Sequence, residues 1–261
     1  SELGMKEMDP YLKNFAVFSH YQGAERHSGE REGDIAVVLV PEGWWWVIPL
    51  AKDRTSVGLV APKRALGGRK PDEAYFLEKI ENTPYLKKRF GGATRVAPVR
   101  TVSDYSFVCR RLCGDRWLLV GDAAAFIDPV FSTGVYLGMQ GAFHAAEAIS
   151  SALARRSFGR RSFAAYERWL SRAVGVYRDF VKGFYSPEFA EALMHPSDRL
   201  QLRQAVTSLL AGRGVGCFEV TWRVWVFKTL ARANRRLNLM PRLPGRREAY
   251  QAFSQGVAST R

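Results

Sequence analysis

The sequence has no long apolar run and few cysteines and histidines, and each shortage excludes a class of protein. No stretch of about 18 consecutive apolar residues occurs, so we expect no transmembrane helix. The first ten residues, SELGMKEMDP, carry charges and no apolar stretch, so we expect no secretory signal in them. The three cysteines and four histidines show no paired ligand spacing, which argues against a zinc site. Reduced thiols in the cytoplasm are the expected setting.

Acidic residues are in the minority, and this imbalance bears on possible partners. The 261-residue chain has 39 Lys and Arg against 25 Asp and Glu, a net charge of +14, which by itself favours nucleic acid or an anionic membrane. However, no run of five or more basic residues occurs, and no zinc-finger or RNA-binding signature accompanies them. We therefore expect solvated basic helix faces and no nucleic acid. A non-catalytic basic helical module that binds nucleic acid stays the alternative.

The composition excludes a disordered chain, because 47% of the residues are hydrophobic. Along the chain, the hydrophobic pattern changes from one typical of strands to one typical of helices. Expected strands lie at 34–40, 44–50, 55–60, 94–108 and 116–120, with a helix at 71–90 that Asp72 caps or opens as a first-turn acid. Expected helices follow at 134–156, 162–184, 197–211 and 217–238, with Trp169, Tyr177, Trp222, Trp225 and Phe227 in the core. The predicted division is 1–110, 111–156 and 157–261.

Residues 116–149 carry the most chemical information. They read as a buried strand ending at Gly121-Asp122, an irregular loop, and a Ser132-Thr133-Gly134 step that opens a long Ala-rich helix. The carboxyl end of such a strand faces the ligand crevice of open α/β sheets, and a helix N-terminus offers N–H groups to an anion or a carbonyl oxygen. An ordinary strand–loop–helix with a Ser or Thr cap is the alternative.

The same segment resembles a known family. Gly121-Asp122-Ala123-Ala124 followed by the run from Asp128 to Val135 resembles the second FAD motif of flavin-dependent monooxygenases and halogenases. The resemblance implies that Asp122 holds the ribityl chain and that the helix N-terminus faces the pyrimidine edge of the flavin. The implied cofactor-binding residues are Gly121, Asp122, Pro129, Ser132, Thr133, Gly134 and Val135.

A second motif narrows the resemblance. Residues 44–49, Trp-Trp-Trp-Val-Ile-Pro, fit the W-x-W-x-I-P signature of flavin-dependent halogenases. The resemblance implies that Trp44, Trp46, Ile48 and Pro49 screen the flavin from the substrate. It also implies that backbone N–H groups at Thr133 and Gly134 hold a chloride or bromide ion. A well-packed strand is the alternative interpretation of the three tryptophans.

Together the motifs imply a fold and an activity. The expected fold class is α+β or α/β: part of a glutathione-reductase-like FAD-binding fold with an antiparallel substrate-facing sheet, followed by a mainly helical C-terminal region. The expected activity uses reduced FAD from a separate flavin reductase, oxygen and a halide to halogenate a phenol or pyrrole, free or bound to a carrier protein. A FAD-dependent monooxygenase or dehydrogenase without halide chemistry is the alternative.

Two family features have no match in the sequence. The strand-associated G-x-G-x-x-G that receives the FAD pyrophosphate does not occur, and the glycine-rich segment 212–216 has the wrong spacing and reads as an interhelical loop. The family's essential lysine also has no counterpart among Lys52, Lys63, Lys70 and Lys79. We therefore expect the sequence to be the C-terminal portion of a longer flavoprotein, with the catalytic lysine outside this chain.

Overall fold

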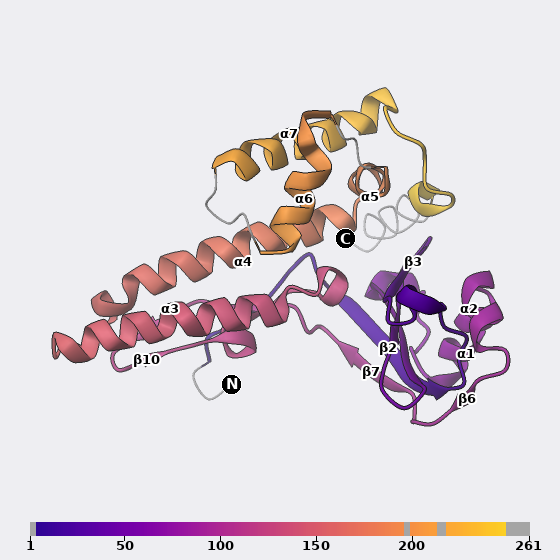
Figure 1. Ribbon diagram of the computed structural model, residues 1–261, viewed down its shortest axis with the longest axis horizontal. Helices are drawn as coiled ribbons and strands as arrows, with labels where there is room; N and C mark the ends of the chain where they lie inside the picture. The colour runs from indigo at the N-terminus through magenta and orange to yellow at the C-terminus, as the bar shows by residue number, and fades with distance from the viewer. Residues whose placement is uncertain (1–3, 196–198, 213–217, 249–261) are drawn as a thin grey trace. The chain divides into compact units, whose positions relative to one another are not determined.

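The computed structural model describes residues 4–195, 199–212 and 218–248, which form two compact units (Figure 1). One unit consists of the described residues within Ser1–Leu12 and Tyr105–Leu243, and the other of those within Lys13–Asp104 and Pro244–Arg261. The glycine-rich segment 212–216 lies outside the described residues except for Gly212. The predicted division at 110 and 156 follows the change from strands to helices and stays a prediction.

The unit containing residues 13–104 is built on a six-stranded antiparallel sheet. Its strand order is β3-β4-β5-β2-β6, with β7 also paired with β2. The strands are β2 (Asn14–Gln22), β3 (Ala36–Val40), β4 (Gly43–Pro49), β5 (Arg54–Pro62), β6 (Thr94–Arg95) and β7 (Arg100–Ser103). The predicted strands at 34–40, 44–50 and 55–60 are confirmed as the meander β3-β4-β5. The strand character predicted at 94–108 is confirmed in part, because three short strands with turns between them occupy this range.

Two helices cover one face of this sheet, α1 (Glu73–Glu81) and α2 (Pro84–Phe90) (Figure 1). The cap at Asp72 is confirmed, since its carboxylate accepts a hydrogen bond of 3.0 Å from the Tyr75 N–H. The single helix predicted over 71–90 is wrong. Proline disfavours the helical region for the residue before it, and Thr83, which precedes Pro84, has φ −107° and ψ 102°. Pro84 then opens a new helix as its first residue.

The second unit has short strands and long helices. A three-stranded sheet of β1 (Lys6–Met8), β8 (Phe107–Cys109) and β11 (Ala125–Phe126) lies beside a hairpin of β9 (Cys113–Gly114) and β10 (Trp117–Leu118). The buried strand predicted at 116–120 is wrong. Only two residues pair, antiparallel and half-buried, because Arg116 adopts a left-handed turn before them and a 3-10 helix begins at Gly121.

Five α-helices complete this unit within its described residues: α3 (Gly134–Ala154), α4 (Ala164–Phe184), α5 (Pro187–Met194), α6 (Leu202–Leu210) and α7 (Phe218–Leu237). Helices α3 and α4 run side by side, and α5, α6 and α7 gather at the C-terminal half of α4 (Figure 1). The helices predicted at 134–156, 162–184 and 217–238 are confirmed over their described residues. In the helix predicted at 197–211, residues 202–210 are α-helical and 199–201 form a 3-10 turn, whereas 197 and 198 lie outside the described residues; α5 was not predicted.

Aromatic rings form the contact between these helices. Phe180 of α4 packs against Phe189 of α5 and Phe227 of α7, with ring centroids 5.3 and 6.3 Å apart. The core positions predicted for Tyr177 and Phe227 are confirmed, whereas the prediction for Trp225 is wrong, because its side chain is 63% exposed.

The described ranges contain neither a membrane-spanning helix nor a metal-binding cluster. No helix there is long and apolar enough to cross a membrane. No group of three or more His, Cys, Asp or Glu side chains in the same ranges gathers in a metal-binding arrangement. Cys109 and Cys113 are free buried thiols, and burial raises the pKa of both. A raised pKa disfavours the reactive thiolate, so these thiols are suited to packing.

Candidate functional site

A cavity of about 410 Å³ opens between the 121–135 loop, the start of α3 and the middle of α4. The lining includes every cofactor-binding residue predicted from the sequence, namely Gly121, Asp122, Pro129, Ser132, Thr133, Gly134 and Val135. Apolar side chains supply most of the remaining wall: Ala124, Ala125, Phe126, Ile127, Leu137, Leu170 and Val174. The structure thus places all seven of these residues around one concave, largely apolar space.

The loop reaches this shape through two left-handed residues and one buried carboxylate. Gly121 has φ +58° and Ser132 has φ +52°, so the backbone reverses at each end of the loop. Between them, the buried Asp128 carboxylate accepts hydrogen bonds from the Val130 N–H at 3.1 Å and from the Tyr185 hydroxyl at 2.9 Å. Asp128 therefore ties the loop both to itself and to the end of α4.

The N-terminus of α3 faces the cavity without a side-chain cap. Thr133 is buried, but its hydroxyl makes no capping hydrogen bond, and the first helical bond runs from the Leu137 N–H to the Thr133 carbonyl at 2.9 Å. The side-chain capping hydrogen bond that the alternative interpretation requires is therefore not observed at Thr133. The N–H groups of the first turn have no partner within a helix, and the helix dipole makes this end positive. This is a suitable place for an anion or a carbonyl oxygen.

Asp122 supplies an acceptor at the other end of the lining. Its side chain is exposed and makes no hydrogen bond within the described part of the chain. It is therefore free to accept hydrogen bonds from hydroxyl groups of a ligand.

Sequence reasoning missed the part of this site that α4 and the residue after it supply. Leu170 and Val174 line the cavity, and Tyr185 holds Asp128. Their spacing on an amphipathic helix predicts that they are buried. It does not predict that they pack against the 121–135 loop, because this loop lies 35 or more residues earlier in the sequence.

The tryptophan motif lies on β4, in the sheet-containing unit. Successive side chains of a strand point to opposite faces. Trp45 and Val47 accordingly join the core beneath α1 and α2, whereas Trp44, Trp46 and Ile48 occupy the other face. The packed-strand interpretation therefore describes Trp45, and Trp44 is equally buried, with 2% of its side chain exposed. The residues at the W-x-W-x-I positions, Trp44, Trp46 and Ile48, lie on the face of the sheet away from the helices.

The indole of Trp46 is fixed by its neighbours on that face. Its N–H donates to the Ser56 hydroxyl at 3.0 Å, and its ring lies 5.8 Å from the Phe18 ring and 6.1 Å from the Trp44 ring. Gly58 lies beneath it, where a Cβ atom would be only 2.3 Å from Trp46 Cζ2. A glycine is required here to make room for the indole. Because this motif and the 121–135 loop belong to different units, its screening role stays a prediction.

Comparison with known proteins identifies the family. The model of the tryptophan halogenase family matches residues 34–191, which include both motifs. The chain belongs to this family. Among curated relatives, it is 30% identical over 221 residues to the 1H-pyrrole-2-carbonyl-(peptidyl-carrier protein) brominase of Pseudoalteromonas luteoviolacea, covering 83% of this chain and 52% of the relative. It is also 30% identical over 211 residues to the corresponding chlorinase of Pseudomonas fluorescens, covering 77% and 47%.

Solved structures agree with this assignment. The flavin-dependent brominase Bmp2 superposes with a TM-score of 0.74 at 27% identity, covering 87% of this chain and 58% of the brominase. The chondrochloren halogenase CndH gives a TM-score of 0.64 at 28% identity, covering 86% and 57%. The expected resemblance and the mixed α/β fold with antiparallel sheets and a helical C-terminal region are confirmed. The chain spans about half the length of the curated relatives it matches.

Proposed function

We propose that this chain forms the halide- and flavin-facing part of a FAD-dependent halogenase. The observation that carries the proposal is the cavity in which all seven predicted cofactor-binding residues meet at the uncapped start of α3. The residues fit a flavin: an apolar wall suits a flat ring, and the helix N-terminus suits its carbonyl oxygens. When bound, reduced FAD supplies the electrons with which oxygen is activated and a halide is oxidised to hypohalous acid.

The residues of this chain then have distinct tasks. Asp122 accepts hydrogen bonds from the ribityl hydroxyls, and its exposed carboxylate has no competing partner among the described residues. The N–H groups at Thr133 and Gly134 hold the flavin edge and a chloride or bromide ion, assisted by the positive end of α3. Leu170 and Val174 exclude water from the apolar side of the ring. Exclusion of water strengthens each of these polar contacts.

The tryptophan face of β4 has the complementary task of screening. Trp46 and Ile48 are half-buried and present a rigid apolar surface, with the buried Trp44 ring packed against Trp46 and with Pro49 at the end of the strand. Such a surface keeps an electron-rich substrate from direct oxygenation while hypohalous acid forms. The substrate is a phenol or pyrrole, and the relatives named as pyrrolyl-carrier-protein halogenases favour one tethered to a carrier protein. Reduced FAD comes from a separate reductase.

The experiment is flavin retention in the natural gene product with Asp122→Ala. Loss of hydrogen bonds to a charged acceptor, typically about 1.5–3 kcal/mol, lowers flavin affinity about tenfold or more. Glu147→Ala is the matched control, because it removes an exposed carboxylate from α3 outside the cavity lining. Equal flavin affinity in both variants and the unmodified protein would remove Asp122 from the site.

A further inference from the structure

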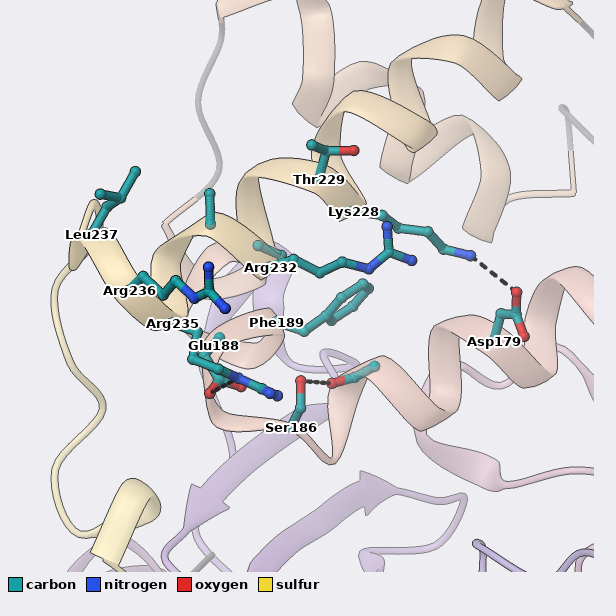
Figure 2. Close-up of a pocket in the computed structure, with 13 residues that line it drawn as sticks. Asp179, Ser186, Glu188, Phe189, Lys228, Thr229, Arg232, Arg235, Arg236 and Leu237 are labelled. Atoms are coloured by element: carbon teal, nitrogen blue, oxygen red, sulfur yellow. Dashed lines mark hydrogen bonds and ion pairs between the residues drawn. The ribbon is translucent and has the colours of Figure 1, made fainter. Parts of the chain in front are cut away.

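A second and larger cavity, of about 940 Å³, lies between α4, α5 and α7 (Figure 2). Its polar lining comes from Asp179, Ser186, Glu188, Lys228, Thr229, Arg232, Arg235 and Arg236. Four of these side chains are basic and two are acidic. The groove therefore carries a net positive charge on a chain that is itself strongly basic.

The two acidic side chains are already engaged. Lys228 Nζ lies 3.3 Å from Asp179 Oδ2, as Figure 2 shows, and Arg235 Nε lies 3.0 Å from Glu188 Oε1. The guanidinium groups of Arg232 and Arg236 are exposed and make no ion pair within the described part of the chain. An unpaired guanidinium is a strong bidentate donor to a phosphate or carboxylate, so these two arginines are available to an anionic partner.

The same helix carries two exposed aromatic side chains on the part that precedes its groove-lining residues. Phe218 is 80% exposed and Trp225 is 63% exposed. A separation of seven residues brings side chains back to one helix face, so Phe218, Trp225 and Arg232 share a face of α7. Exposed Trp and Arg side chains are the residue types that contribute most to protein–protein binding. This α7 surface, defined by Phe218, Trp225, Arg232 and Arg236, therefore has the composition of a docking surface.

The α7 surface is connected to the proposed flavin cavity by α4. Val174 lines the flavin cavity and Gly183 lines the groove, nine residues further on, which is about 13 Å along the helix at 1.5 Å per residue. Nine residues also turn the helix by half a revolution, so the two cavities lie on opposite faces of α4. They approach each other where α4 ends. Ser186 lines the groove, and its neighbour Tyr185 donates to Asp128 of the flavin loop.

We propose that the α7 surface and its groove dock an acidic carrier protein that delivers the aromatic substrate on a phosphopantetheine arm. The proposal rests on the proposed function. Arg232 and Arg236 bind the phosphodiester of the arm and acidic side chains of the carrier, and Trp225 packs against its apolar side chains. The flexible arm then extends round the C-terminal end of α4, past Tyr185, toward the flavin cavity, and holds the aromatic ring where hypohalous acid reaches it, away from the flavin itself. Charge complementarity supports this occupant, as do the two relatives named for carrier-bound substrates.

Binding of a fluorescently labelled peptidyl carrier protein, with and without its phosphopantetheine arm, to the natural gene product tests this surface. The double variant Arg232→Glu/Arg236→Glu is expected to weaken binding of the arm-bearing carrier at least tenfold. Trp225→Ala, which leaves every charge in place, is expected to weaken it several-fold. Arg168→Glu/Arg172→Glu is the matched control, because it makes the same charge change at exposed positions of α4 outside the groove, and it should change binding less than twofold.

Three results would overturn the docking surface: equal weakening by both double variants, no weakening by the α7 variants, or displacement of the carrier by DNA of equal charge at equal affinity. The last would indicate a nucleic-acid face. Halogenation of a free phenol by the same preparations separates this proposal from the proposed function. Halogenation that persists without arginine-dependent carrier binding contradicts the docking surface alone. Arginine-dependent binding without any halogenation contradicts the function alone.

Discussion

At the scale of single residues, the functional side chains are held in place by neighbours that the motifs do not name. Trp46 depends on Ser56 for a hydrogen bond and on the missing side chain of Gly58 for space. Asp128 depends on Tyr185, which follows α4. The motif residues therefore have fixed positions only because strands and helices distant in the sequence supply the contacts.

Gly58→Ala tests this dependence. The new methyl group would lie 2.3 Å from Trp46 Cζ2 and 2.7 Å from Phe18 Cβ, so the indole must move and its bond to Ser56 breaks. Overpacking of this kind costs about 1–3 kcal/mol, which urea unfolding and tryptophan fluorescence would record. Gly33→Ala is the control, since its Cβ meets no atom within 4 Å, and it should change stability by under about 0.5 kcal/mol. Unchanged fluorescence and stability in Gly58→Ala would contradict the packing described for Trp46.

At the scale of elements, the end of β1 is fastened to α4 through Asp9. This buried carboxylate accepts hydrogen bonds from the Tyr11 and Leu12 N–H groups at 2.8 and 3.2 Å, and it pairs with Arg178 and Lys182. Burial acts to raise the pKa of Asp9, but the hydrogen bonds from Tyr11 and Arg178 outweigh it, so the pKa is lowered below 3.8. The ionised carboxylate thus stabilises the contact between this strand and this helix.

The lowered pKa gives a pH-dependent prediction for Asp9→Asn. A carboxyl whose pKa is lower in the folded chain stabilises it above the unfolded pKa, and this contribution is lost as the pH falls through the folded value. At pH 7 the variant should lose about 1–3 kcal/mol of unfolding free energy, and the difference should shrink below about pH 3.8. Asp34→Asn, which breaks the exposed pair with Arg31, should cost under about 1 kcal/mol. A difference that stays constant from pH 7 to pH 3 would contradict the ionic role of Asp9.

Helices and strands could be predicted where the hydrophobic periodicity extends over many residues. The prediction failed where the element is short. The 21-residue α3 and α4 and the meander β3-β4-β5 follow from uninterrupted periodicity. The eight-residue α5 was not predicted, because the Ser186-Pro187 step by itself indicates a helix break. Proline also favours the first position of a helix, and here it begins α5. Only two residues of the strand predicted at 116–120 pair with a neighbouring strand. Strand pairing depends on partners that the local sequence does not specify.

At the scale of the whole molecule, the sequence located the candidate site but not its walls. The run from Gly121 to Val135 identifies the loop because its glycine, aspartate and helix start are contiguous in the sequence. Leu170, Val174 and Tyr185 come from tertiary packing and were not predictable locally. Net charge was likewise a poor guide to partners by itself. Two arginines that make no ion pair within the described part of the chain share a helix face with exposed aromatic side chains, which is a more specific statement than an overall charge of +14.

The most direct test of halogenase function is product mass as a function of halide. The natural gene product would be supplied with FAD, a flavin reductase, oxygen and either a phenol or a carrier-bound pyrrole, with chloride, with bromide, or with neither. We predict a product in which halogen replaces hydrogen only when halide is present, and less of it with Asp122→Ala. An oxygenated product formed equally well without halide would contradict this account and would identify a FAD-dependent monooxygenase instead.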